Sequence, residues 1–287
     1  GTRLIRAITA RVPVRVVFAP RPEFGQVPIT IDIEDQGLMV MGAAEPMALR
    51  APGITWQIVE DGHHHTAIGT LMVDSQRVTP VDVVIELRTG SNDVEPHPMS
   101  EAARRNTTVD FWRSWVQRLH LPQSHRDDVV RSALTLKALC FDETGAILAA
   151  ATTSLPEGMG GVRNWDYRYC WVRDAALAAK ALVDLGSTEE AQAFLVWLHL
   201  VLADAVAPER LHPLYTIYGK PLGSEAVIDA LPGYGGSRPV RVGNAAQSQV
   251  QLDVFGPVVD LIATLVNVRG RATENDLWLT RACVDAV

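Results

Sequence analysis

The first third of the chain alternates apolar and polar residues in short runs, the pattern of β-strands that bury one face. The clearest run covers residues 29–33, where isoleucine occupies every second position, and a turn follows it at residues 35–37. Comparable runs cover residues 4–8, 12–18, 54–59, 67–73 and 81–87. Because turn residues separate the runs and no helical period intervenes, the pattern predicts an antiparallel β-sandwich over residues 1–95.

The period of the apolar residues changes after Gly90. Residues 96–124 begin with Pro96 and Pro98 and continue with a helical pattern, which predicts a linker and a connecting helix. Over residues 125–287 apolar residues recur at helical spacing, which predicts an all-α domain. Its helices are expected over residues 125–141, 171–185, 187 to about 206, 244–268 and from 273 onwards. Gly186 is a natural stop between the second and the third of them.

Length and charge narrow the class of protein. The 287 residues fit two domains of about 150 residues each. The chain has 26 basic and 33 acidic residues, so its net charge is -7, divided as -4 up to residue 95 and -3 beyond it. Neither part therefore has the basic surface that binding to nucleic acid or to an anionic membrane requires.

The cysteines and the apolar stretches exclude two further classes. The three cysteines lie far apart without a C-x-x-C pair, which excludes a disulfide scaffold and a zinc ribbon. The most apolar stretch, residues 193–207, contains His199 and Asp204 and is shorter than a membrane-spanning helix, which needs about 20 residues. No signal segment opens the sequence. We expect a soluble, cytoplasmic protein without cofactor or metal, and leave the oligomeric state open.

One segment, residues 155–175, concentrates aromatic and charged side chains. Four of the 18 aromatic residues fall within seven positions, and aspartates and arginines lie among or just after them: Trp165, Asp166, Tyr167, Arg168, Tyr169, Trp171, Arg173 and Asp174. Sugar rings stack on aromatic rings, while their hydroxyls bind the fork of an arginine or the two oxygens of a carboxylate. The mixture favours a carbohydrate site; the alternative is an aromatic-rich helix start with local ion pairs.

A second segment, residues 239–247, follows a glycine-rich stretch and leads into a predicted helix. Such a loop can present backbone donors to a ligand, together with the side chains of Arg241 and Asn244. The alternative is an ordinary loop in which Asn244 caps the helix, since asparagine is a good capping residue. The sequence does not decide between these two interpretations.

Three other patterns indicate residues with a structural role and no catalytic or binding role. Residues 63–65 are consecutive histidines, which cannot all face one metal ion, and we expect them in an exposed loop. His199 lies in an apolar helix and is expected to be a core histidine with its hydrogen bonds satisfied. Residues 158–161 are rich in glycine but lack the lysine of a phosphate-binding loop.

Residues 155–175 and 239–256 together resemble the family 15 glycoside hydrolases, which include glucoamylases, glucodextranases and bacterial trehalases. The motifs are long and occur in the family's order. The resemblance implies a β-sandwich followed by an (α/α)6 toroid, with the active site at the mouth of the toroid. It also implies an exo-acting enzyme whose substrate is an α-glucoside or oligosaccharide, without choosing between glucans, dextran-type sugars and trehalose.

The resemblance assigns roles to particular residues. Arg173 and Asp174 match the pair that holds hydroxyls of the terminal glucose, and Tyr167 and Trp171 would line the same subsite. Arg241 and Asn244 match the second substrate-binding loop. The reaction of the family is inverting: a protonated glutamic acid donates a proton to the glycosidic oxygen, while a second glutamate activates water.

The sequence departs from the family pattern in one respect. The catalytic glutamates of the family lie beyond the segment that matches residues 239–244, the acid in a Trp-Glu motif, whereas Trp278 is followed by Leu279. We therefore expect an internal fragment that carries the C-terminal part of the β-sandwich over residues 1–95, half of the glucose subsite, the first part of the toroid and no catalytic residue. Such a fragment is expected to be inactive, and its unpaired helix faces would promote aggregation.

Two other hypotheses remain. One is a non-catalytic carbohydrate-binding protein that retains the sugar pocket without the catalytic glutamates. The other is an enzyme that uses Asp166 and Asp174 as its own acid and base. The second is disfavoured, because Arg173 beside Asp174 favours a permanently ionised carboxylate.

Overall fold

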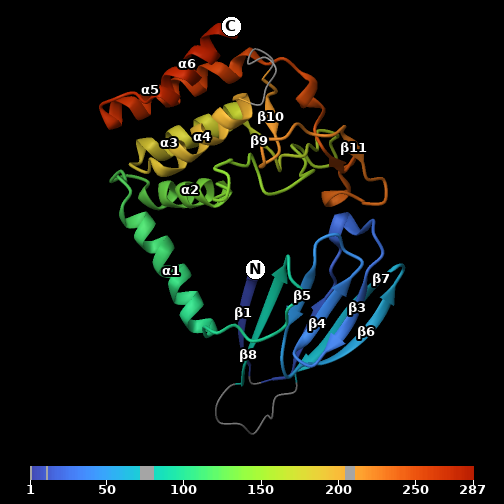
Figure 1. Ribbon diagram of the computed structural model, residues 1–287. Coiled ribbons are helices and arrows are strands. Elements are labelled where there is room, and N and C mark those ends of the chain that lie inside the picture. The colour runs from blue at the N-terminus through green and yellow to red at the C-terminus, as the bar shows by residue number, and fades with distance from the viewer. Residues whose placement is uncertain (1, 11, 72–80, 204–210) are drawn as a thin grey trace. The chain divides into compact units, whose positions relative to one another are not determined.

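The computed structural model describes residues 2–10, 12–71, 81–203 and 211–287 (Figure 1). The chain forms two compact units, one that ends at Phe111 and one that begins at Trp112. The first consists of antiparallel sheets, and we call it the β unit; the second, the helical unit, is mainly helical. The predicted order of antiparallel β-structure followed by α-structure is therefore confirmed.

Two sheets form the β unit. The larger has the strand order β1-β8-β5-β4-β3, with β1 at Thr2–Ala10, β8 at Val81–Thr89, β5 at Met47–Arg50, β4 at Gly37–Met41 and β3 at Thr30–Glu34. The smaller has the order β2-β7-β6, with β2 at Val14–Phe18, β7 at His64–Leu71 and β6 at Thr55–Asp61. The end of the predicted strand 67–73 lies outside the described residues.

An apolar core joins the two sheets. Ile31 of β3 pairs with Val40 of β4 across their hairpin, and both side chains are buried. They belong to one cluster with Leu49 of the larger sheet and Ala67 of the smaller. β4 and β5 escape prediction from the sequence, because β4 is apolar at nearly every position and β5 has only 4 residues.

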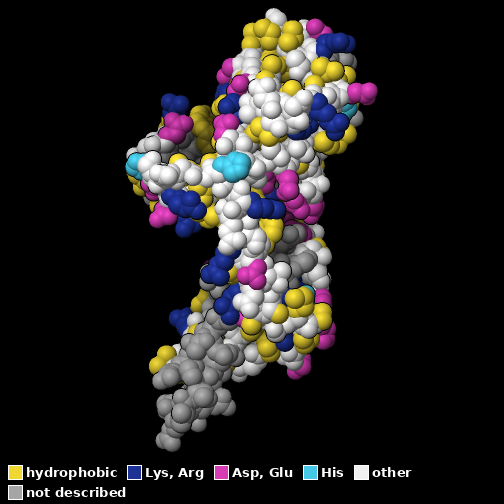
Figure 2. Space-filling model, turned by 90° about the vertical axis from the view of Figure 1, so that its left-hand side faces the viewer, with side chains coloured by type: hydrophobic (Ala, Val, Ile, Leu, Met, Phe, Trp, Pro, Cys, Tyr) yellow, Lys and Arg dark blue, Asp and Glu magenta, His cyan; other side chains and the backbone are white. Residues whose placement is uncertain are grey.

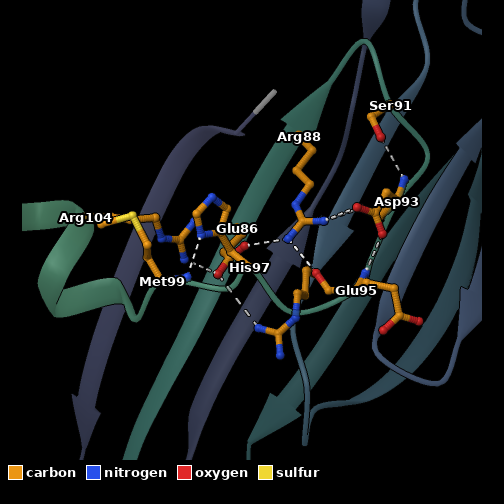
Figure 3. Close-up of polar contacts among 9 residues, drawn as sticks. Glu86, Arg88, Ser91, Asp93, Glu95, His97, Met99 and Arg104 are labelled. Atoms are coloured by element: carbon orange, nitrogen blue, oxygen red, sulfur yellow. Dashed lines mark hydrogen bonds and ion pairs between the residues drawn. The ribbon is translucent and has the colours of Figure 1, made fainter.

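A buried carboxylate ties the larger sheet to α1 (Glu101–Gln117), as Figure 3 shows. Glu86 of β8 accepts hydrogen bonds from Nη2 of Arg88 at 2.9 Å and from Nη2 of Arg104 in α1 at 2.5 Å. Nη1 of Arg50 lies 3.8 Å from the same carboxylate. Burial by itself raises the pKa of Glu86, but the hydrogen bonds from Arg104 and Arg88 outweigh it, so the pKa lies below its usual value.

The helical unit contains the end of α1 and the helices α2 (Arg126–Leu139), α3 (Val172–Asp184), α4 (Glu189–Ala203), α5 (Phe255–Arg269) and α6 (Glu274–Asp285). α3 contacts both α4 and α5, and α5 contacts α6. Ala176 and Ala179 of α3 are buried in the same cluster as Phe194 and Leu198 of α4 and Leu261 of α5. Alanine on the shared face lets the helix axes approach closely.

Most of the predicted helix ends are found. Gly186 has φ 88 and follows Leu185, the C-cap of α3, as the stop signal predicts. Thr273 caps α6, where its side chain accepts from the amide of Asp276, whose carboxylate accepts from the amide of Thr273. The predicted end of α4 near residue 206 lies outside the described residues.

The helix predicted over residues 244–268 is wrong in its first part. Asn244 caps only the 3-10 turn η4 (Ala245–Ser248), the short turn η5 (Leu252–Val254) follows, and α5 begins at Phe255. Pro257 explains the difference, because proline fits the first turn of a helix but breaks a hydrogen bond in the interior. The helix can therefore begin shortly before Pro257, but it cannot extend through it from Asn244.

Two expectations for histidines are wrong. His64 and His65 are part of β7 and do not lie in an exposed loop; His64 is 8% exposed, and Nδ1 of His65 accepts from the amide of Ile31 at 3.0 Å. The β6–β7 hairpin turns before His64, so that both enter the sheet. His199 packs against Trp278, but its Nδ1 is buried without a hydrogen-bond partner among the described residues, so it is not satisfied.

The surface of the helical unit is mixed. Figure 2 shows hydrophobic side chains among charged ones, without a continuous basic stripe on the described part of the face it draws. Large apolar side chains stay exposed on α4 and α6, including Leu200 at 61% and Leu277 at 61%. Within the described ranges, no helix is long and apolar enough to cross a membrane.

Candidate functional site

The aromatic segment of the sequence is an irregular stretch that leads into α3. The short strand β9 (Cys170–Trp171) pairs with β10 (Leu214–Tyr215), and Trp171 is then the residue before α3. Trp171 is buried, and its ring centroid lies 6.3 Å from that of Tyr167. Burial, together with the charge of Glu157, raises the pKa of Tyr167, so its hydroxyl remains a protonated donor.

Asp166 joins this stretch to the second segment. Its carboxylate is fully buried and accepts from Nε of Arg168 at 2.9 Å and from Nη2 of Arg168 at 2.7 Å. Oδ2 also accepts from the amide of Gly243 at 3.1 Å, and the backbone oxygen of Asp166 accepts from Nδ2 of Asn244 at 3.2 Å. One buried aspartate therefore fixes the two predicted site segments to each other.

The second segment is a strand followed by a turn. β12 (Arg241–Val242) pairs with β11 (Ala226–Val227), and Gly243 then takes φ 81, which an L-residue rarely adopts. Oδ1 of Asn244 accepts from the amide of Ala246 at 3.0 Å. Both polar ends of the Asn244 side chain therefore bond to the protein, which is the capping interpretation.

Arg241 also bonds to the protein. Its Nε donates to Oε1 of Glu225 at 3.0 Å, and its Nη1 donates to the backbone oxygens of Val162 and Asn164, each at 3.1 Å. Its guanidinium carbon lies over the Trp165 ring, 4.4 Å from the centroid. Arg241 therefore holds neighbouring parts of the site together.

A pocket of about 290 Å³ lies between the two segments. Aromatic rings and uncharged amides form most of its lining, which consists of Trp165, Tyr167, Trp171, Asn244, Ala245, Ala246, Gln249 and Gln251. None of these side chains is charged. Nε1 of Trp171 and Oε1 of Gln251 are buried without hydrogen-bond partners among the described residues. The lining suits a neutral ligand that has both apolar faces and hydrogen-bonding groups.

Arg173 and Asp174 occupy the first turn of α3, directly after Trp171 of the pocket wall. Nη2 of Arg173 lies 3.3 Å from the carboxylate of Asp174, and its Nη1 donates to Oδ2 of Asp253 at 2.7 Å. The hydrogen bond to Asp253 and the charge of Asp174 raise the pKa of Arg173, which stays a cation. The side chain of Asp174 is 46% exposed, so its carboxylate is open to a ligand.

The structure thus separates the six predicted site residues into groups. Tyr167, Trp171 and Asn244 line the pocket, Arg173 and Asp174 lie beside it, and Arg241 lies outside its lining. Five lining residues were not among these six: Trp165, which the sequence analysis placed in the aromatic segment without giving it a role, Ala245, Ala246, Gln249 and Gln251. Glutamine at 247, 249 and 251 has the period of an extended segment, and that signal could have identified two of them.

A larger hollow of about 350 Å³ lies in the β unit, beside Ile29, Glu60, His63 and His65. It has no tryptophan, tyrosine or arginine in its lining, so it lacks the mixture that marks the helical-unit pocket. The described residues contain no group of three histidine, cysteine or acidic side chains able to hold a metal ion.

Comparison with known families divides the chain at nearly the same place as its fold. Residues 1–112 match the family model "Trehalase-like, N-terminal", and residues 123–286 match "Glycosyl hydrolases family 15". The second match covers more than half of the chain and contains every residue of the pocket.

Curated relatives match both units. Trehalase 1 of Sulfolobus acidocaldarius is 34% identical over 262 residues, which is 90% of this chain and 43% of the relative. The trehalase of Mycobacterium tuberculosis is 42% identical over 189 residues, which is 64% of this chain and 27% of the relative. The trehalase of Thermoplasma volcanium is 40% identical over 176 residues, 61% of this chain and 27% of the relative. The chain therefore matches less than half the length of these relatives.

Proposed function

We propose that this chain, which belongs to family 15 of the glycosyl hydrolases, carries glucose-binding residues of an exo-acting α-glucoside hydrolase. The pocket is the observation that supports the proposal: three aromatic side chains and three amides line it, and a cation and a carboxylate begin the adjoining helix. A glucosyl unit needs apolar surface for its C–H faces and paired polar groups for its hydroxyls. The names of the relatives make trehalose the first substrate to test, with glucoamylase-type sugars second.

The six residues act in two ways under this proposal. Tyr167 and Trp171 contact the sugar ring, and Arg173 and Asp174 bind hydroxyls of the terminal glucose. Arg241 and Asn244 shape the second loop, since their side chains bond mainly to the protein. The helices α2 to α6 would belong to the first part of an (α/α)6 toroid.

Hydrolysis would follow the inverting route, in which two carboxyl groups about 6.5–9.5 Å apart act as acid and base. The carboxylates around the pocket do not suit the role of acid, because each lies in an ion pair with an arginine: Glu157, Asp166, Asp174, Glu225 and Asp253. A general acid must be free to donate a proton to the glycosidic oxygen, whereas each of these carboxylates is engaged by a guanidinium group. We therefore propose that the 287-residue chain binds the substrate without hydrolysing it.

The same ion pairs support a second candidate, a carbohydrate-binding protein without catalysis. Calorimetric titration of the chain with trehalose, maltose and isomaltose tests the binding that both candidates require, with lactose as the control sugar. Binding of no α-glucoside would contradict both candidates. The two candidates are separated by the release of glucose from trehalose or maltose by a protein that contains this chain together with catalytic glutamates, followed with a coupled hexokinase assay.

In that assay the chain alone should release no glucose, whereas a protein that contains the chain together with catalytic glutamates should. If such a protein is active, nuclear magnetic resonance of the first product tests the mechanism. From α,α-trehalose, inversion gives β-glucose from the attacked unit and α-glucose from the leaving unit in equal amounts, whereas initial release of α-glucose alone would contradict inversion.

A further inference from the structure

Trp165 forms one wall of the pocket, and a cation covers one of its faces. The guanidinium carbon of Arg241 lies 4.4 Å from the centroid of the indole ring. Trp165 lines the pocket and Arg241 does not, so the guanidinium lies outside the lining of the space that a ligand would occupy. A cation held over a ring face is attracted by the quadrupole of that ring, which favours a fixed ring orientation.

The backbone just before Trp165 is fixed by the same guanidinium. Nη1 of Arg241 donates to the backbone oxygens of Val162 and Asn164, each at 3.1 Å, and Asn164 is the residue directly before Trp165. Arg241 therefore contacts both the Trp165 ring and the backbone that precedes it. The planar fork of arginine can do both at once, whereas the single ammonium of lysine cannot.

A second residue of the pocket lining is joined to Arg241 through Glu225. Oε1 of Glu225 accepts from Nε of Arg241 at 3.0 Å, and its Oε2 accepts from the amide of Ala245 at 3.1 Å. Ala245 lines the pocket together with Trp165. Because the side chains of Arg241 and Glu225 are only 14% and 20% exposed, water competes little for these bonds. The Glu225–Arg241 pair therefore connects Trp165 and Ala245 of the lining.

We propose that Trp165 is a sugar-stacking platform and that Arg241, held by Glu225, is the positioning residue that fixes it. The ligand is a pyranose ring of a neutral α-glucoside, so this inference rests on the proposed function. Trp165 contacts the C–H face of the sugar with the ring surface that Arg241 leaves free. Arg241 acts on binding through Trp165 and makes no contact of its own with the sugar.

The test measures Kd for trehalose and maltose with the intact chain, and thermal melting shows that each variant is folded. Trp165→Leu should raise Kd about three- to tenfold, because an aromatic contact with the sugar is lost. Trp165→Phe, which keeps an aromatic ring, should raise Kd by about half of that factor or less. Arg241→Lys should also weaken binding, but not in the Trp165→Leu background. Tyr218→Leu is the matched control, since Tyr218 is 64% exposed and lies outside this pocket.

If Arg241→Lys fails to fold, Glu225→Gln tests the same positioning role. It should weaken binding when Trp165 is present and leave binding unchanged in the Trp165→Leu background. Acrylamide quenching gives a readout that needs no sugar: Arg241→Lys should raise the quenching of the Trp165 emission, obtained by difference from Trp165→Phe. Unchanged Kd in Trp165→Leu would overturn the platform, and an equal loss from Arg241→Lys in both backgrounds would overturn the positioning role. If the unsubstituted chain binds no α-glucoside, the proposed function fails first.

Discussion

Asp166 and Arg168 form a two-pronged ion pair, with Nε of Arg168 2.9 Å from Oδ1 and Nη2 2.7 Å from Oδ2. The carboxylate is fully buried and also accepts from the amide of Gly243, 77 positions further along the chain. Asp166→Ala should lower the free energy of unfolding by about 3 kcal/mol, because it leaves Gly243 and Arg168 without this acceptor. Urea unfolding measures the change.

The same variant should also weaken the binding of α-glucosides, since the second loop loses its attachment. Asp260→Ala is the control, because Asp260 is 61% exposed and its only described ion pair is long, 3.9 Å from Lys180. That change should cost about 0.5 kcal/mol or less. An Asp166→Ala chain as stable as the Asp260→Ala chain would show that the buried pair does not join the segments.

Arg173 should matter for binding and little for stability. Its partners Asp174 and Asp253 are 46% and 60% exposed, and ion pairs so open to water contribute about 0–1 kcal/mol. Arg173→Ala should therefore unfold at nearly the same urea concentration but bind trehalose more than about tenfold more weakly, because charge-assisted hydrogen bonds to hydroxyls are lost. Lys180→Ala on the same helix is the matched control. Equal affinities of the two variants would contradict the role of Arg173.

The free energy of unfolding should decrease in acid, because Glu86 becomes protonated and loses its ion pairs. Its pKa in the folded chain is lower than in the unfolded chain, where it is about 4.3. The contribution of Glu86 is therefore complete above about pH 4.3 and is lost as the pH falls through the folded pKa. The difference in unfolding free energy between the unsubstituted chain and Glu86→Gln should shrink from pH 6 to pH 3. If this difference in unfolding free energy grows from pH 6 to pH 3, the pKa of Glu86 is raised in the folded chain and the prediction is wrong.

The three thiols should react slowly while the chain is folded. Burial raises the pKa of Cys140 and Cys170 to about 12 and that of Cys283 to about 11, so little thiolate exists at pH 8. Titration with a chromogenic disulfide reagent should show a slow phase in buffer and all 3 thiols within the mixing time in urea. A fast phase of one thiol in buffer would point to an exposed cysteine.

The exposed apolar side chains of α4 and α6 predict self-association. Val196, Leu200, Leu277 and Val284 are between 56% and 62% exposed, which is unusual for so many large side chains on two helices that contact each other. Light scattering should detect aggregation that increases with protein concentration and with sulfate. Leu200→Lys together with Leu277→Lys should reduce it. A monodisperse monomer that melts cooperatively would contradict this prediction.

The helix ends and the site segment could be predicted because local chemistry determines them. Thr273 and Gly186 act on the turn in which they occur, and the aromatic residues of the site are neighbours in sequence. The pocket itself depends on contacts between distant residues, such as the bond from Gly243 to Asp166, which no local pattern encodes. For the same reason, Arg241 was expected to bind substrate, whereas its bonds are to Glu225 and to backbone oxygens.

The joint between the two units falls inside α1, between Phe111 and Trp112. Arg104, near the start of this helix, is bonded to Glu86 of the β unit, while Trp115, near its end, donates to Ser187 of the helical unit. The two ends of one helix therefore belong to different compact units, and we expect each unit to unfold cooperatively. In native-state hydrogen exchange, the amides near Arg104 should exchange when the sheet unfolds, and those near Trp115 when the helices unfold. The amides of the single helix α1 would then report two separate unfolding reactions.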